Sequence, residues 1–402
     1  MSAEKPRAHK AHSGKGPDSG TRFWNDPGKR ALIFQTLLLG VLGFLIYSVV
    51  DNTLHNLQTR GITTGFDFLH EEAGFGIPLS LIEYTEADSY GRTFIVGLLN
   101  TILVSVLGII AATLLGFVLG VARLSDNWLV ARLSSLYIEI FRNIPLLLQI
   151  FFWYFAVLRA LPSPRQSIEI FGGYLNVRGL SVPSPVPGDG FGLVAGALLL
   201  AIVASVILVR WNHRRQDATG QIFPAGWISL GLILGLPLLT FFATGMPLSL
   251  DRPELRGFNF TGGMTLLPEL VALWLALTIY TAAFIAETVR GGILAVPGGQ
   301  LEAASALGLP KRRTLRLIII PQAMRVIIPP LTSQYLNLTK NSSLATAIGY
   351  PDLVSVFAGT TLNQTGQAIE VISMTMAVYL TLSLLTSLFM NWYNKRMSLV
   401  ER

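Results

Sequence analysis

The sequence predicts an all-α protein, a polytopic bundle of about eight membrane-spanning helices. Of its 402 residues, 51% are hydrophobic and only 13% are charged. The mean hydropathy is strongly positive for so long a chain, and several apolar runs reach the roughly 20 residues that cross about 30 Å of hydrocarbon. The formal net charge of +7 could indicate a nucleic-acid-binding protein, but excess Lys and Arg on cytoplasmic loops accounts for it.

The spans follow a polar tail. Residues 1–30 hold seven Lys or Arg and few apolar side chains, which predicts a disordered cytoplasmic tail. The run 31–50 is expected to stay as a membrane span, because it lies far from the start and no Ala-x-Ala cleavage site follows it. The eight predicted spans are 31–50, 93–121, 134–161, 191–209, 226–244, 266–288, 326–348 and 369–390.

The distribution of basic residues predicts the orientation of these spans. With the tail inside, the segments on its side of the membrane carry 21 Lys or Arg, and those on the opposite side carry six. Lys and Arg gather on cytoplasmic loops, so we expect both termini to be cytoplasmic. Of the opposite-side segments, 51–92 holds seven acidic residues and is expected to contain a short interfacial helix. Residues 162–190, with the run SVPSPVPGDG, are expected to form a solvated linker.

Catalytic and metal-binding patterns are missing from the sequence. Cysteine is absent, which excludes disulfides and thiolate chemistry. SGKGPDSG in the tail lacks the spacing of a phosphate-binding loop, and there is no HExxH or suitably placed GxSxG motif. The five histidines fall in the tail or on predicted loops. We therefore expect no catalytic residue, no metal site and no cofactor bound by this chain, which argues against a membrane-embedded enzyme.

A polar segment, GGQLEAASALGLPKRRTLRLIIIPQAM at 298–324, interrupts the apolar pattern. Gln300–Leu307 is expected to form about two helical turns, with Gly308 in the left-handed conformation that ends helices. Pro310 suits the first turn of a second helix. Small alanines beside Glu302 would allow the first helix to dock in a groove of a soluble partner. An ordinary amphipathic loop is the alternative.

The spacing within this segment resembles a known signature. Glu302-Ala303-Ala304, three residues, Gly308, nine residues, Ile318, one residue, and Ile320-Pro321 is similar to the EAA signature of ATP-binding-cassette importer permeases, which usually has Leu at the position of Ile320. FRNIPLLLQIFFWYF at 141–155, YTAAFIAETVRGGILAVPGGQ at 280–300 and PQAMRVIIPPLTSQYLNLTKNSSLATAIG at 321–349 resemble the polar-amino-acid branch of that family. The domain layout resembles the larger permease subunit of general L-amino-acid systems.

The resemblance implies a type I importer permease in the bacterial inner membrane that works with a separate ATPase, which uses ATP and Mg. Further implied partners are a paralogous permease, a second ATPase copy and a periplasmic amino-acid-binding protein. The ATPase-coupling residues would be Glu302, Ala303, Ala304, Gly308 and Pro321. The expected layout is the tail 1–30, an extra span and periplasmic segment 31–92, core 93–161, an inserted loop and span pair 162–265, core 266–392 with the coupling loop 289–325, and a cytoplasmic end 393–402.

Polar residues within the predicted spans form two groups. Glu139 with Arg142, and Glu287 with Arg290, are each three residues apart and therefore able to pair on one helix face. They would serve structural pairing or a gate near the coupling loop. The run Lys340, Asn341, Ser342 and Ser343 could contact a zwitterionic substrate, because it offers both a cation and acceptors; helix packing by small polar residues is the alternative.

Two transporter classes remain after these exclusions. The first is the ATP-driven amino-acid permease that the resemblance implies. The second is an ion- or proton-coupled secondary amino-acid transporter, which would more often show inverted repeats and acidic residues at mid-membrane. Neither feature is clear in the sequence. It also leaves open which amino acids are carried.

Overall fold

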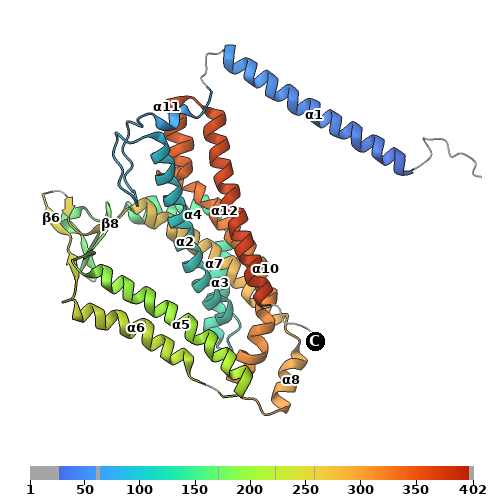
Figure 1. Cartoon of the computed structure of the whole chain (residues 1–402), viewed down its shortest axis with the longest axis vertical. Coiled ribbons are helices and arrows are strands. Elements are labelled where there is room, and N and C mark those ends of the chain that lie inside the picture. The colour runs from blue at the N-terminus through green and yellow to red at the C-terminus, as the bar shows by residue number, and fades with distance from the viewer. Residues whose placement is uncertain (1–26, 60–63, 171, 222, 258, 398–402) are drawn as a thin grey trace, which may run out of the picture. The chain divides into compact units, whose positions relative to one another are not determined.

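A computed structural model describes residues 27–59, 64–170, 172–221, 223–257 and 259–397. The chain divides into two compact units, 1–65 and 66–402. The tail predicted to be disordered falls mainly on residues 1–26, outside the described residues. The first unit contributes the helix α1 (Pro27–Thr59) (Figure 1). Its portion Lys29–Thr53 is long and apolar enough to cross a membrane, as predicted for the first span.

The second unit is built mainly of helices, which confirms the predicted fold class. In the described residues of both units, seven helices are long and apolar enough to span a membrane, or eight if one bent pair forms a single span. The α-helices of this unit are α2 (Tyr90–Ala122), α3 (Trp128–Asn143), α4 (Leu146–Phe151), α5 (Phe191–Thr219), α6 (Ala225–Ala243), α7 (Pro268–Leu294), α8 (Gly298–Ala306), α9 (Lys311–Thr314), α10 (Ile320–Asn341), α11 (Leu362–Thr365) and α12 (Ala368–Met397).

Shorter helices of other types extend or precede these elements. Before α2, the expected interfacial helix is reduced to the single 3-10 turn η2. Two π-helical stretches lengthen α4 and link α9 to α10, so α9, η5, α10 and η6 make one apolar run at Lys311–Ile348. The 3-10 helices are η2 (Asp67–His70), η4 (Pro164–Gln166) and η6 (Ser342–Ile348), and the π-helices are η3 (Phe152–Leu158), η5 (Leu315–Ile319) and η7 (Val354–Thr361).

The span predicted at 134–161 is a sharply bent pair of helices and not one straight helix. The helix α3 ends at Asn143, and the next helical stretch, Leu146–Leu158, is bent from it by 105°. Ile144 adopts an extended conformation, with φ −95° and ψ 126°, and Pro145 follows it. Proline disfavours helical backbone in the residue before it and has no N–H to donate. The chain therefore turns sharply at a position where hydropathy alone shows no break.

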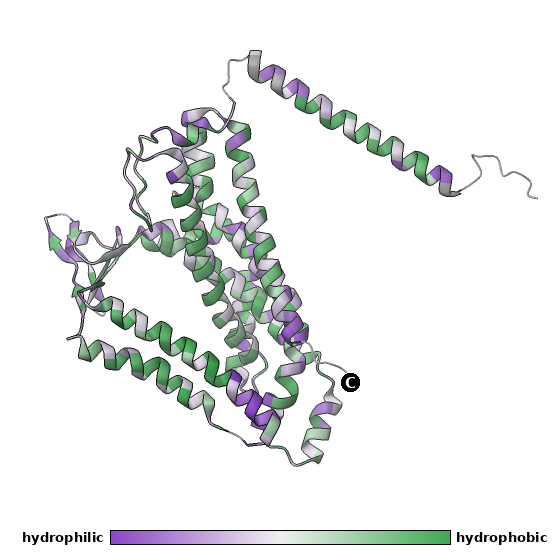
Figure 2. Ribbon diagram, viewed as in Figure 1, coloured by the Kyte–Doolittle hydropathy of each residue, from purple (hydrophilic) through white to green (hydrophobic). Residues whose placement is uncertain are grey.

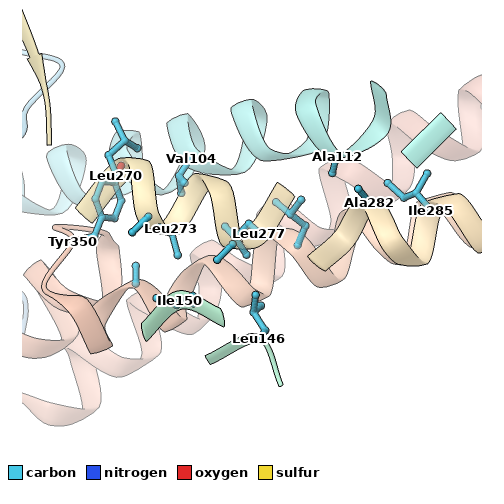
Figure 3. Packing of buried hydrophobic residues seen from close by; sticks show 14 of the residues in the cluster. Val104, Ala112, Leu146, Ile150, Leu270, Leu273, Leu277, Ala282, Ile285 and Tyr350 are labelled. Carbon is cyan, nitrogen blue, oxygen red and sulfur yellow. The ribbon is translucent and has the colours of Figure 1, made fainter. Parts of the chain in front are cut away.

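The core of the second unit lies around α7, which packs against α2, α10, α3 and α4. Figure 3 shows apolar side chains of α2, α4 and α7 meeting there, among them Val104, Ile150 and Leu273. Small residues let α2 approach α7 closely. A Cβ added at Gly116 would lie 2.6 Å from the Cβ of Ile285, nearer than real side chains approach. The core therefore depends on glycine at this contact as well as on apolar burial.

The segments flanking α5 and α6 are not the solvated linker that the sequence suggested. They form a four-stranded antiparallel sheet with strand order β1-β2-β3-β8, and two separate strand pairs, β4-β5 and β6-β7. In β3 and β8 the partners include Leu180 with Leu266, so the two ends of the insertion meet. The strands are β1 (Ile168–Ile170), β2 (Gly173–Asn176), β3 (Gly179–Val182), β4 (Ser184–Pro187), β5 (Leu248–Asp251), β6 (Glu254–Arg256), β7 (Asn259–Thr261) and β8 (Met264–Leu266).

The helices α5 and α6 form an antiparallel hairpin between these strands. Small residues lie at their contact, where Ala201 and Ala225 are buried and the Ser205 hydroxyl donates to the Ser229 carbonyl at 3.4 Å. Among the described elements, neither helix packs on another to a similar extent. Figure 2 shows both helices apolar along most of their length. The inserted hairpin is therefore joined to the rest of the unit mainly through the strands.

Candidate functional site

The helix α8 lies outside the candidate spans, between the end of α7 and the start of α9. Its C-terminus has the two hydrogen bonds of a Schellman motif. The Leu309 N–H donates to the Ala304 carbonyl at 3.0 Å, and the Gly308 N–H donates to the Ser305 carbonyl at 3.0 Å. Gly308 has φ +70°, which confirms its predicted left-handed conformation. This geometry fixes the direction in which the chain leaves α8.

The surface of α8 combines one acid with exposed leucines. Glu302 and Ala303 are exposed, and Ala304 is buried at 1%. Leu301 and Leu307 are 52% and 78% exposed, although this segment lies outside the apolar spans. Glu302 takes part in no ion pair within the described part of the chain. An exposed apolar patch beside a free carboxylate is typical of a protein-docking surface.

The chain returns toward the bundle through α9, η5 and α10. Pro310 caps α9 at the N-terminal side, and the helix itself begins at Lys311, one residue later than the sequence suggested. Pro321, half-buried, is the second residue of α10, and because it has no N–H it cannot donate to a carbonyl of the preceding η5. The π-helix η5 separates the two α-helical pieces. Beyond the bend that follows α8, the elements α9, η5 and α10 form a continuous helical path that leads to the buried face of α10.

A charge cluster lies where the C-terminal parts of α2, α3 and α7 meet. Glu287 of α7 accepts from Arg290 at 2.6 Å and from Arg123, just beyond α2. The expected pair of Glu139 with Arg142 is not among the ion pairs of the described residues. The Arg142 guanidinium instead lies 5.2 Å from the centre of the Phe284 ring.

Sequence spacing could not reveal the contribution of Arg123. Its partner is 164 residues away in the chain, and helix periodicity identifies only neighbours on one helix. Arg123, Glu139, Arg142 and Glu287 line a hollow of about 300 Å³. The cluster therefore ties α2 to α7 about two turns before α7 ends.

The predicted polar run 340–343 is only partly brought together. Lys340, the last residue but one of α10, is exposed, and with Ser343 it lines a hollow of about 340 Å³ that also touches Thr375 and Tyr379 of α12. Asn341 does not line this hollow, and Ser342 is buried, donating to the Thr339 carbonyl at 2.7 Å. A cation and hydroxyl groups thus meet at this position, as required for a carboxylate-bearing ligand.

Asp352 lies close to this hollow and was not identified from the sequence. Its side chain is fully buried and accepts from the Ser355 N–H at 2.9 Å and from the Tyr379 hydroxyl at 3.4 Å. Burial raises the pKa of the Asp352 carboxyl to about 6. The residue lies between the last two candidate spans, so no hydropathy window marked it. Among the described residues, no group of three or more His, Asp and Glu could hold a metal ion.

Comparison with known proteins supports the transporter family that the sequence motifs resemble, and the matches cover most of the chain. The family described as "Binding-protein-dependent transport system inner membrane component" matches residues 105–399. The chain is 60% identical to the putative amino-acid ABC transporter permease protein YhdX of Escherichia coli (strain K12), covering 95% of this chain and 98% of that protein.

Two further relatives match at similar coverage. One is the general L-amino acid transport system permease protein AapQ of Rhizobium johnstonii, 54% identical over 94% of both chains. The other is the glutamate/glutamine/aspartate/asparagine transport system permease protein BztB of Rhodobacter capsulatus, 44% identical over 93% of this chain and 95% of that one. The resemblance in the sequence motifs is thus confirmed, and the chain belongs to the family of binding-protein-dependent transport system inner membrane components.

Proposed function

We propose that this chain is a permease subunit of an ATP-binding-cassette importer for L-amino acids, and that α8 couples its pore to a separate ATPase. The observation that carries the proposal is the docking surface of α8, where Glu302, Leu301 and Leu307 are exposed and the Schellman motif fixes the direction in which the chain leaves the helix. The names of the three relatives support amino acids as the substrate class.

The proposed coupling residues act in different ways. Glu302 offers a charge to a basic groove on the ATPase, and the exposed Ala303 keeps that face of the helix thin enough to enter it. Ala304, which is buried, allows α8 to pack closely on the rest of the chain and so holds this face outward. Gly308 sets the bend after α8, and Pro321 starts α10. A push on α8 would then pass through α9 and η5 to α10, which packs on α7 and α12.

The proposed assembly contains two permeases, two ATPase subunits and a periplasmic amino-acid-binding protein. The second permease is a paralogue that supplies the other half of the pathway. ATP and Mg are bound by the ATPase subunits and not by this chain. Both termini face the cytoplasm, on the same side as α8, because basic residues gather on those segments. Residues 31–92 and 162–265 are additions to a core formed by 93–161 and 266–392.

Reconstituted transport tests this proposal directly. This permease, its paralogue and the ATPase would be placed in liposomes with the binding protein added outside, and uptake of labelled glutamate, glutamine, aspartate and asparagine would be measured. We expect uptake that requires internal ATP and the binding protein and persists when a protonophore removes the proton gradient. Uptake driven by an ion gradient without ATP would instead establish a secondary transporter.

Glu302→Lys tests the docking role of α8 within the same assay. It reverses a charge outside the candidate spans, so membrane insertion should persist while the ATPase dissociates during purification or hydrolyses ATP without uptake. Glu86→Lys is a matched control, because it reverses an exposed charge in the segment before α2. Normal uptake and normal ATPase retention in Glu302→Lys would contradict coupling through α8.

We further propose that Lys340 contributes to the substrate pathway. It is the one of the four predicted residues that brings a cation to the hollow shared with α12, and it could attract the carboxylate of an amino acid. Lys340→Met is expected to lower uptake or to change the preference between acidic and neutral amino acids. Asn341→Ala is the control, because Asn341 does not line the hollow. Unchanged uptake across the substrate panel would leave Lys340 with a packing role.

A further inference from the structure

The surface of the inserted hairpin changes from apolar to cationic near the C-terminus of α5. Val203 and Ile207 are 57% and 61% exposed, and Arg210 and Arg214 are exposed farther along the helix. Steps of four, three and four residues place these four side chains in one stripe along the helix. One face of α5 therefore passes from apolar to cationic, and Figure 2 shows the same change from green to purple.

Within the described residues, neither arginine of this stripe has an acidic partner, because the ion pairs there involve other side chains. Arg210 and Arg214 also donate no side-chain hydrogen bond to any of those residues. The adjacent Arg215 differs, since it donates to the Gln221 side chain at 2.8 Å and lies 5.3 Å from the centre of the Trp211 ring. Two guanidinium groups are thus available to an external anion.

Tryptophans mark the membrane interface at this level. Trp211 is 47% exposed on α5, and Trp227 is 78% exposed near the start of α6. From the contact of Ser205 with Ser229, Trp211 lies about 9 Å along α5 and Trp227 about 3 Å along α6 at ~1.5 Å per residue. Indole rings favour the headgroup level of a bilayer. The unpaired arginines therefore lie at the depth where lipid phosphates are found.

We infer that the end of the inserted hairpin binds the headgroups of anionic phospholipid through Arg210 and Arg214. Lipid is favoured over a protein partner because the stripe continues directly from a lipid-facing apolar surface, and because the hairpin packs on no other described helix to a similar extent. The forked guanidinium groups can each donate two hydrogen bonds to a phosphate. The inserted pair would thus anchor the permease to the acidic lipids of its membrane.

Native mass spectrometry of the delipidated full-length permease tests this inference. Phosphatidylglycerol and phosphatidylcholine with identical acyl chains would be titrated separately onto wild-type protein and Arg210→Gln/Arg214→Gln. We expect the double variant to bind phosphatidylglycerol about 25-fold more weakly, given about fivefold per arginine near an acidic surface, and to bind phosphatidylcholine as before. Arg210→Lys/Arg214→Lys should recover most of the preference, since it keeps both charges.

A matched control variant and three further results decide whether the two arginines bind anionic lipid. Arg252→Gln/Arg256→Gln removes two charges from the strand segments at the other end of the hairpin and should leave the preference unchanged. Equal loss in that control would overturn the inference, as would equal phosphatidylglycerol binding by wild type and Arg210→Gln/Arg214→Gln. Competition by millimolar inorganic phosphate would indicate a free-phosphate site instead. Loss of ATPase co-purification with unchanged lipid binding would indicate a protein partner.

Discussion

The bundle around α7 and the inserted α5–α6 hairpin are both helical and apolar, but they differ in what their helices contact. In the bundle, residues such as Leu273 and Ile285 have no exposed surface, and glycines let the helices approach closely. In the hairpin, Leu199 and Leu239 are 66% and 69% exposed, and the glycines of α6 have open space around them. Movement can be transmitted through the first region, whereas the second presents its surface to lipid.

The largest expected difference between the bundle and the hairpin is the loss of uptake when the glycine that ends a helix is replaced. Gly308 after α8 and Gly220 after α5 have φ of +70° and +68°, and neither has an atom within 4 Å of an added Cβ. Valine costs each site about 1–2 kcal/mol of backbone strain. Gly308→Val should lower ATP-driven uptake more than about tenfold. A strain of about 1.4 kcal/mol already lowers tenfold the population of the left-handed conformation in which the chain leaves α8. Gly220→Val should retain most uptake. Equal uptake by the two variants at equal abundance would remove the distinction between the regions.

A second comparison concerns helix packing. Gly116→Ala in α2 forces a Cβ against Ile285, and overpacking of this kind costs about 1–3 kcal/mol. Gly231→Ala in α6 meets no atom within 4 Å and should be neutral or slightly stabilising, since alanine favours helix. Thermal unfolding in detergent should show a lower midpoint only for Gly116→Ala. A similar fall in both variants would mean that the hairpin is packed as tightly as the bundle.

Ion pairs offer a third comparison. Glu287→Gln leaves Arg123 and Arg290 without their carboxylate, at side chains that are 22% and 31% exposed. We expect a loss of about 1–2 kcal/mol, between the values for exposed and buried pairs. Glu254→Gln breaks the pair with Arg256, which is 74% exposed, and should leave the unfolding midpoint unchanged. If the two substitutions have the same effect, the cluster does not tie α2 to α7.

The smallest expected effect is a pH dependence of stability. Because the folded pKa of Asp352, about 6, lies above its ordinary value, the folded state binds the proton more tightly and loses stability as pH rises through 6. Between about pH 5.5 and 7 the loss should be about 0.8 kcal/mol. Asp352→Asn should remove this fall, while Asp217→Asn in the exposed part of α5 should keep it. The same fall in Asp352→Asn would assign it to another group.

The sequence predicts those parts of the fold that depend on residues close together in the chain. Hydropathy located the long helices, and the Ala-rich turn followed by Gly308 identified α8 and its left-handed end, because helix termination depends on neighbouring residues. The bend before Pro145 was missed because hydropathy averages over a proline within an apolar run. The strands were missed because their partners lie far apart, as Leu180 and Leu266 show. The same distance concealed the contact of Arg123 with Glu287.

The most direct measurement of coupling is cross-linking from α8 to the ATPase. The chain has no cysteine, so Leu307→Cys and Gln216→Cys each introduce a unique thiol, one on α8 and the other at the exposed end of α5. A photoactivatable reagent on each thiol would be illuminated in the assembled transporter. We predict an ATPase product from position 307, with loss of ATP-driven uptake after illumination, and little product from position 216. No ATPase product from position 307, or an equal yield from both positions, would contradict coupling through α8.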